Sequence, residues 1–138
     1  MSDESTTPDV VGLMRQSYEA VSRGELSAQL VSPHVQVDVS DAGFGTFVGE
    51  EAVTQFFEDW HRSWEDYRFE EEELRDLGHG VGLSVVRESG RLVGGKGRVE
   101  QRVAQVWIWA GGKLEWLKAY RDPDEARADA ERIAAERG

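Results

Sequence analysis

Residues 103–122 read VAQVWIWAGGKLEWLKAYRD, two apolar runs joined by Ala110-Gly111-Gly112-Lys113. That junction is typical of a tight β-hairpin turn. Three of the five tryptophans lie in the hairpin, and alternate positions on both faces of its first strand are apolar. A strand of this kind must be covered on both sides. We therefore expect helices or a pocket on one face and a partner subunit on the other.

The overall composition is that of a single soluble domain, with 138 residues, of which 39% are hydrophobic and 31% charged. The net charge of -11 repels phosphate backbones, so we expect no binding to nucleic acid. No apolar run approaches the ~20 residues of a membrane span. The first residues, MSDESTTPDV, lack the features of a signal peptide, so we expect a cytoplasmic protein without membrane contact. The absence of cysteine excludes disulfides, thiolate nucleophiles and cysteine metal sites.

The first part of the chain shows clear helix and strand signals. Residues 1–6 are polar, and we expect them to be disordered. Thr7 is the expected N-cap of a helix that runs to Arg23, with Pro8 and Asp9 in its first turn. Residues 35–41 read VQVDVSD, a strict alternation that predicts a strand with its valines on one face.

The remaining elements complete an α+β pattern. We expect a helical turn over 26–31, a loop or short hairpin over 42–49, an aromatic helix over 50–66, strands over 67–77, 81–88, 98–110 and 113–121, turns at 78–80 and around 89–90, and a last helix from Asp122. This order predicts a cone-shaped fold, in which a strongly bent antiparallel sheet wraps around the N-terminal helices.

Several segments resemble the SnoaL-like (polyketide cyclase-like) proteins of the nuclear-transport-factor-like and ketosteroid-isomerase-like superfamily. They are YEAVSRGEL at 18–26, VGEEAV at 48–53, WED at 64–66, AQVW at 104–107, GKL at 112–114 and YRD at 120–122. The resemblance implies a single cystatin-like cone over residues 7–138. It does not imply one activity, because this fold hosts isomerases, cyclases, dehydratases, hydrolases and non-catalytic binders.

The resemblance also implies a small hydrophobic ligand inside the cone, with no cofactor and no metal. Strand parity and the aromatic helix indicate the inward-facing residues: Val37, Val39, Phe56, Trp60, Trp64, Gln105, Trp107, Leu117, Ala119 and Arg121. Arg121 at the mouth of the cone would orient a carboxylate or enolate group. Its alternative role is an ion pair with Asp41 or a neighbouring aspartate.

In this superfamily the convex face of the sheet commonly forms a homodimer. The residues of the penultimate strand that face this side are Ala104, Val106 and Ile108, and we expect them at a subunit interface. The alternative is that the C-terminal helix covers them.

The catalytic set of the ketosteroid isomerases is only partly matched. Their aspartate base aligns with Asp41 or with Val39, depending on the spacing. Gln105 stands where they have an acidic oxyanion donor, and Ser17 where they have a tyrosine, with Tyr18 one position away. Asp41 also suits a turn-capping role before Gly43.

Other chemistries find less support. The three histidines are expected in solvent, and the basic residues between 87 and 102 are expected to pair with the acidic run at 70–73. Three functions therefore stay open: a small-molecule-binding domain, a cofactor-independent isomerase, cyclase or dehydratase that acts on a hydrophobic carbonyl compound by proton transfer, and a dimeric interaction module whose cavity is filled by its own side chains.

Overall fold

Six strands form one bent sheet with helices on both faces in the computed structural model, which describes residues 9–25 and 29–138. The elements are α1 (Val10–Ser22), β1 (Val31–Asp38), the 3-10 turn η2 (Ser40–Ala42), β2 (Thr46–Val48), α2 (Glu50–Arg62), β3 (Trp64–Gly78), β4 (Val81–Leu92), β5 (Val99–Ala110), β6 (Lys113–Tyr120) and α3 (Pro123–Arg137).

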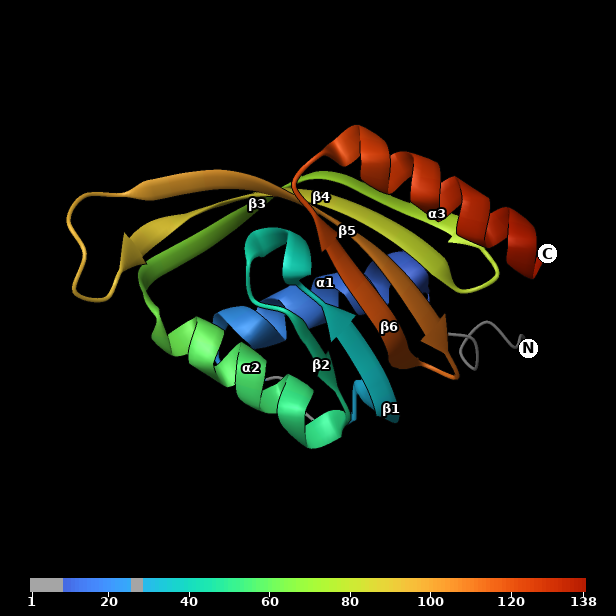
Figure 1. Ribbon diagram of the computed structural model, residues 1–138, viewed down its shortest axis with the longest axis horizontal. Helices are drawn as coiled ribbons and strands as arrows, with labels where there is room; N and C mark the ends of the chain where they lie inside the picture. The colour runs from blue at the N-terminus through green and yellow to red at the C-terminus, as the bar shows by residue number, and fades with distance from the viewer. Residues whose placement is uncertain (1–8, 26–28) are drawn as a thin grey trace, which may run out of the picture.

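The strands lie in the order β2-β1-β6-β5-β4-β3. Only the β1–β6 pair is parallel within this sheet, and the other four pairs are antiparallel. In Figure 1, α1 and α2 lie on one side of the sheet and α3 on the other. The predicted α+β cone, in which a strongly bent and mostly antiparallel sheet wraps around N-terminal helices, is confirmed.

The β5–β6 hairpin forms as the sequence predicts. Ala110 pairs with Lys113 across a turn in which Gly111 and Gly112 both have positive φ, at 60° and 79°. On the concave face Trp107 and Leu117 join the core with the buried valines of β1. The hairpin is therefore apolar on its concave side because it meets β1 and α1 there.

The opposite face of the hairpin is covered by α3. Ala104 and Val106 are fully buried and pack in one cluster with Ala126 and Ala130 of this helix. Ile108 lies at the edge of the cluster and is only partly buried. The C-terminal helix thus covers this face of the sheet. No second subunit can contact Ala104 or Val106 while α3 stays in place. Homodimer formation itself stays a prediction.

Two helix boundaries differ from the expected ones. The described part of α1 begins at Val10, and Asp9 caps it by accepting a hydrogen bond from the amide of Gly12 at 3.2 Å. Asp9 is therefore the cap and not a first-turn residue. Thr7 and Pro8 lie outside the described residues, and so do the segment 1–6 and part of the turn expected at 26–31. Helix α2 ends at Arg62, so Trp64 is the first residue of β3 and not a helical residue.

Strand boundaries differ as well, and β1 begins at Val31, within the segment expected as a helical turn. Strand β1 ends at Asp38 and not at Asp41, the last residue of the alternating stretch, and Asp41 lies in η2. Strand β4 continues through Ser89 and Gly90, where a turn was expected. Gly90 is a packing glycine: a Cβ there would lie 2.8 Å from Cε3 of Trp64, so the missing side chain makes room for this ring.

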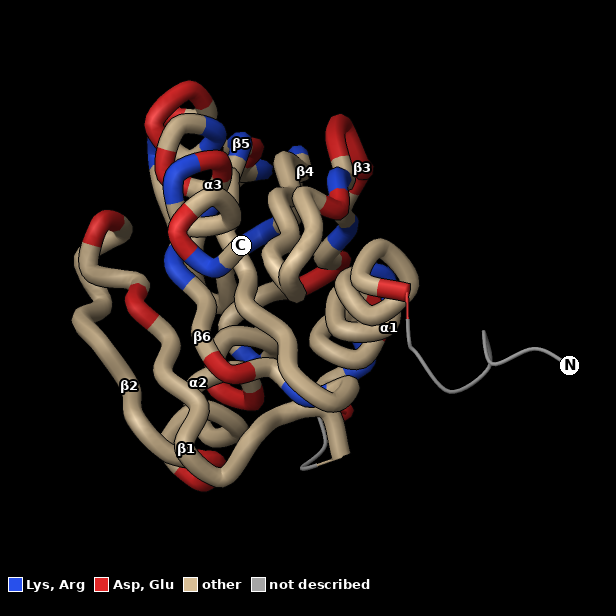
Figure 2. The backbone as a smooth tube through the Cα atoms, turned by 90° about the vertical axis from the view of Figure 1, so that its right-hand side faces the viewer, with Lys and Arg blue, Asp and Glu red and all other residues tan. Residues whose placement is uncertain are grey.

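Charged residues of both signs lie along α3 and β3 (Figure 2). On β3, Glu72 pairs with Arg87 at 3.0 Å and with Arg102 at 2.8 Å, as the charge pattern predicts. No helix of the described chain is long and apolar enough to cross a membrane. Among the described residues, His, Asp and Glu side chains form no group that could hold a metal ion.

The turn before β4 provides a test of this packing. Gly80 has φ +79°, and a Cβ there would collide with the carbonyl oxygen of Trp109. We expect Gly80→Ala to lower the free energy of unfolding by about 1–3 kcal/mol from backbone strain, and further through the collision. Gly43→Ala is the matched control, because Gly43 also has positive φ but opens onto empty space. Equal losses in denaturant unfolding would contradict the close approach at Gly80.

Candidate functional site

A cavity of about 890 Å³ lies between the concave face of the sheet and the helices α1 and α2. Strands β3 to β6, both helices and the segment 39–44 contribute side chains to its wall. Most of the lining side chains are apolar or aromatic: Tyr18, Val21, Leu30, Val31, Val39, Phe44, Phe56, Phe57, Trp60, Trp64, Tyr67, Leu92, Val99, Val103, Trp107, Leu114, Leu117, Ala119 and Tyr120.

The structure brings most of the residues expected in the site into this wall. These are Val39, Asp41, Phe56, Trp60, Trp64, Gln105, Trp107, Leu117, Ala119 and Arg121. Val37 is the exception: it is fully buried in the core and does not line the cavity. The alternation of residues 35–39 shows that the valines face the core. Which of these valines lines the cavity depends on the bend of the sheet, which the sequence does not show.

Aromatic rings form a continuous wall from the mouth inward. Phe44 lies edge-on to Trp60 with ring centroids 6.2 Å apart, and Trp60 contacts Trp64 at 5.5 Å. Trp64 in turn contacts Tyr67 at 5.5 Å. Helix α2 supplies Trp60, whereas Trp64 and Tyr67 come from β3, so the wall joins the helix to the sheet.

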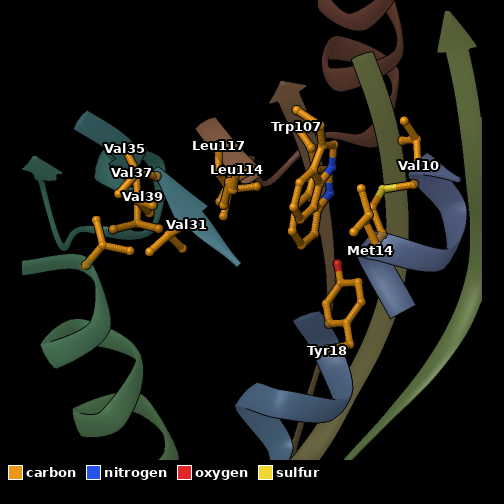
Figure 3. Packing of buried hydrophobic residues seen from close by; sticks show 14 of the residues in the cluster. Val10, Met14, Tyr18, Val31, Val35, Val37, Val39, Trp107, Leu114 and Leu117 are labelled. Atoms are coloured by element: carbon orange, nitrogen blue, oxygen red, sulfur yellow. The ribbon is translucent and has the colours of Figure 1, made fainter. Parts of the chain in front are cut away.

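A chain of hydrogen bonds crosses the inner end of the cavity. The indole N–H of Trp107 donates to Oγ of Ser84 at 2.8 Å, and Oγ of Ser84 lies 2.8 Å from the hydroxyl of Tyr18. The Tyr18 hydroxyl donates to the amide oxygen of Gln105. The donors therefore run in one direction, from Trp107 through Ser84 and Tyr18 to Gln105, and each buried group has a partner. In Figure 3 the Tyr18 hydroxyl points toward Trp107.

The two neighbouring hydroxyl residues of α1 differ in what they bond. Both Ser17 and Tyr18 line the cavity, but the Ser17 hydroxyl donates to Leu13 of its own helix at 2.9 Å. Tyr18 is the residue of α1 whose hydroxyl reaches the sheet, and burial raises its pKa, so it stays a proton donor at neutral pH.

Glu88 is a buried acid in the cavity wall, and sequence reasoning missed it. Only 6% of its surface is exposed. Its Oε2 accepts a hydrogen bond from the Tyr67 hydroxyl at 2.6 Å, and its Oε1 accepts one from Nε2 of Gln101 at 3.0 Å. Burial raises the pKa of the carboxyl, while the two hydrogen bonds act in the opposite direction. The signal was present in β4, where Ser84, Val86 and Glu88 alternate on the concave face.

Asp41 and Arg121 meet at the mouth, through the backbone. Oδ2 of Asp41 accepts a hydrogen bond from the backbone amide of Arg121 at 2.8 Å, and both residues are exposed. Asp41 thus ties η2 to the end of β6, and the contact with Arg121 runs through the backbone amide of that residue, whereas the sequence suggested a side-chain ion pair. Gln105 lies at the far end of the hydrogen-bonded chain, where its amide group can offer N–H to a ligand oxygen.

The arrangement of the sheet and helices defines the fold. A bent sheet wrapped around two helices, open at one end, is the nuclear-transport-factor-like fold of the ketosteroid-isomerase-like and SnoaL-like proteins. No protein-family model matches the sequence, and no curated protein matches it either.

Solved structures with this fold are similar over most of the chain. An NTF2-like protein from Burkholderia thailandensis is 26% identical, with 90% of this chain and 98% of that chain covered and a TM-score of 0.68. A SnoaL-like polyketide cyclase from Jannaschia is 10% identical, with 95% and 97% covered and a TM-score of 0.70. SalBIII, described as an epoxide hydrolase/cyclase-like enzyme in pyran ring formation, is 13% identical, with 88% and 95% covered and a TM-score of 0.70.

The hydrogen-bonded chain can be tested with two buried serines. Ser84→Ala removes the acceptor of the Trp107 indole and a partner of Tyr18, so we expect the free energy of unfolding to fall by about 1–3 kcal/mol. Ser17→Ala, an equally small change at a buried site, leaves no side-chain partner unsatisfied and should cost less than about 0.5 kcal/mol. Denaturant unfolding of both variants makes the comparison; similar losses would mean that Ser84 does not hold the network.

Proposed function

We propose that this protein binds a small, mainly apolar molecule in the cavity between the sheet and the helices α1 and α2. The observation that carries the proposal is the cavity itself: about 890 Å³, walled by aromatic rings, with its polar groups gathered at a few points. Ligand pockets of proteins have volumes of roughly 300–1,000 Å³ and this kind of lining. The polar groups at Glu88 and Gln105 would fix the orientation of the ligand.

The open volume favours ligand binding over a cavity that is filled by its own tryptophans. Trp60, Trp64 and Trp107 lie in the wall and pack against other rings or against the sheet, which leaves the space between them free. A purely structural role in dimerisation would not need such a space, since an unfilled apolar cavity lowers stability.

Catalysis by proton transfer is a second candidate, favoured by Glu88. It is the one acidic or basic side chain that is buried among the described residues, and the Tyr67 hydroxyl contacts it. Its carboxylate would take a proton from the carbon next to a ligand carbonyl. The electron pair would move to the oxygen, where an N–H of Gln105 could stabilise the charge, and the proton would return at another carbon. Glu88 thereby replaces Asp41 as the favoured base.

Filling the cavity tests the binding proposal. Ala119→Leu adds three carbon atoms at a buried position of the wall. We expect wild-type protein to respond to some member of a panel of hydrophobic carbonyl compounds, fatty acids and steroids, by tryptophan fluorescence and by a raised melting temperature. We expect Ala119→Leu to weaken that binding at least about tenfold, a loss of about 1.4 kcal/mol. Ala128→Leu, on the exposed side of α3, is the matched control and should bind as wild type. A panel without any response would overturn the proposal.

Proton transfer is tested on the best-binding carbonyl compound of the panel. Wild-type protein in D₂O is expected to introduce deuterium next to the carbonyl, and Glu88→Gln is expected to slow this exchange by about 10²–10⁴-fold. Asp41→Asn should slow it by less than about tenfold; the reverse order would make Asp41 the base. Binding without exchange in wild-type protein would leave binding as the function.

A further inference from the structure

We propose that the ligand carries a permanent or protonated positive charge: an apolar amine or quaternary ammonium compound whose cationic group lies between the Glu88 carboxylate and the rings of Trp64 and Tyr67. This inference rests on the proposed binding function and adds the chemical class of the ligand.

The first step is the missing positive partner of Glu88. Within residues 9–25 and 29–138, its two oxygens contact only the uncharged groups of Tyr67 and Gln101. The neighbouring arginines are used elsewhere: Arg87 and Arg102 both pair with Glu72. Arg87 precedes Glu88 in the strand, so its side chain leaves the opposite face of the sheet. A buried carboxylate without a cation is costly, and a positively charged ligand would offset that cost.

The second step is the way in which Glu88 is hydrogen-bonded. Tyr67 donates to one carboxyl oxygen and Gln101 to the other, which is the pattern that suits the ionised form. Burial opposes ionisation and raises the pKa of this carboxyl. The site thus holds two donors aimed at a negative charge in surroundings that disfavour it, and a bound cation would resolve this conflict.

The third step is the aromatic wall beside the carboxyl. The hydroxyl of Tyr67 donates a hydrogen bond to Glu88, so the Tyr67 ring lies beside the carboxyl. The centroids of the Trp64 and Tyr67 rings are 5.5 Å apart. Trp64 also lies over Gly90, two residues beyond Glu88 on the same face of β4. The faces of Trp and Tyr attract cations, and ammonium groups are recognised by such clusters of rings. Carboxylate and rings together suit an organic cation better than a hydrated metal ion.

The groups that face Glu88 bear on the pH dependence of cation binding. Tyr67 on β3 and Tyr18 on α1 have pKa values raised by burial, so both stay neutral up to mildly alkaline pH, and Gln101 on β5 does not titrate. Arg102 on β5 forms an ion pair with Glu72, and His61 on α2 lies against Gly24. Because a cation binds the ionised carboxyl more tightly, its affinity should rise with pH through the raised pKa of Glu88 and then level off.

The test compares two probes of the same shape. Phenyltrimethylammonium carries a permanent charge, and tert-butylbenzene is its uncharged analogue. Titrations followed by tryptophan fluorescence and calorimetry are made from about pH 5 to about pH 8. At the upper pH we expect wild-type protein to bind the ammonium compound at least about tenfold more tightly than tert-butylbenzene. The affinity for the ammonium compound should fall as the pH is lowered, while the affinity for tert-butylbenzene should not depend on pH.

Variants locate the effect. Glu88→Gln should lower the affinity for the ammonium compound at least about tenfold and leave that for tert-butylbenzene within about twofold. Glu100→Gln is the matched control: it removes one acidic charge from an exposed side chain, and it reports any effect of the net charge alone. If Glu88→Gln does not fold, the ratio of the two affinities in wild-type protein and its pH dependence still decide the question.

The possible failures are distinguishable. Equal binding of the two probes, or an equal loss in Glu88→Gln and Glu100→Gln, would overturn the cationic ligand and leave the apolar cavity as a binding site. Absence of binding by both probes and by the whole panel of apolar compounds would overturn the cavity as a binding site, and the cationic ligand with it.

Discussion

Residues 81–86 of β4 and 104–109 of β5 are buried or half-buried on both faces of the sheet, and the rest of the structure depends on covering them. On the convex side α3 does this with small residues, Ala126 and Ala130, which let the helix lie close to the sheet. On the concave side α1 covers only part of the surface, with Met14 and Val10 seated over Gly82. Helix α1 packs against β3 and β4, and α2 packs against β1, β2 and β3; the concave surface between the two helices becomes the cavity. The hollow is therefore a consequence of how two helices share one curved surface.

Polar groups inside this apolar enclosure are arranged in two separate sets. The chain from Trp107 through Ser84 and Tyr18 to Gln105 satisfies its own donors, joins α1 to β4 and β5, and acts mainly as structure. The set around Glu88 differs, because a buried charge there meets only neutral donors. Functional sites are places where local rules of stability are broken and compensated elsewhere. By that criterion Glu88 differs from the chain that ends at Gln105, in which each buried group has a neutral partner.

Much of the fold could be predicted from the sequence, because the hairpin at 103–122, the alternating valines and the capped last helix are local patterns. The segments that resemble SnoaL-like proteins added the prediction that the sheet forms a cone. The exact ends of elements were harder: Trp64 continues a helical stripe of aromatic residues, yet Ser63 ends the helix and Trp64 opens β3. Gly90 resembled a turn signal, although the cause of the glycine is the Trp64 ring, a contact between residues far apart in the chain. Glu88 was missed for a similar reason. Its position in the strand shows its face, but its burial depends on how Tyr67 and Gln101 close over it.

The parallel pairing of β1 with β6 has a consequence for the way in which the chain acquires its structure. These strands lie far apart in the chain, and the contact between Asp41 and Arg121 spans eighty residues. One wall of the hollow therefore does not exist until the last strand has been synthesised and has left the ribosome. A distant pairing of this kind slows folding, because the long intervening loop must close before the two strands can pair. Until β6 and α3 are in place, the apolar side chains of β4 and β5 are open to solvent, and such exposure favours aggregation.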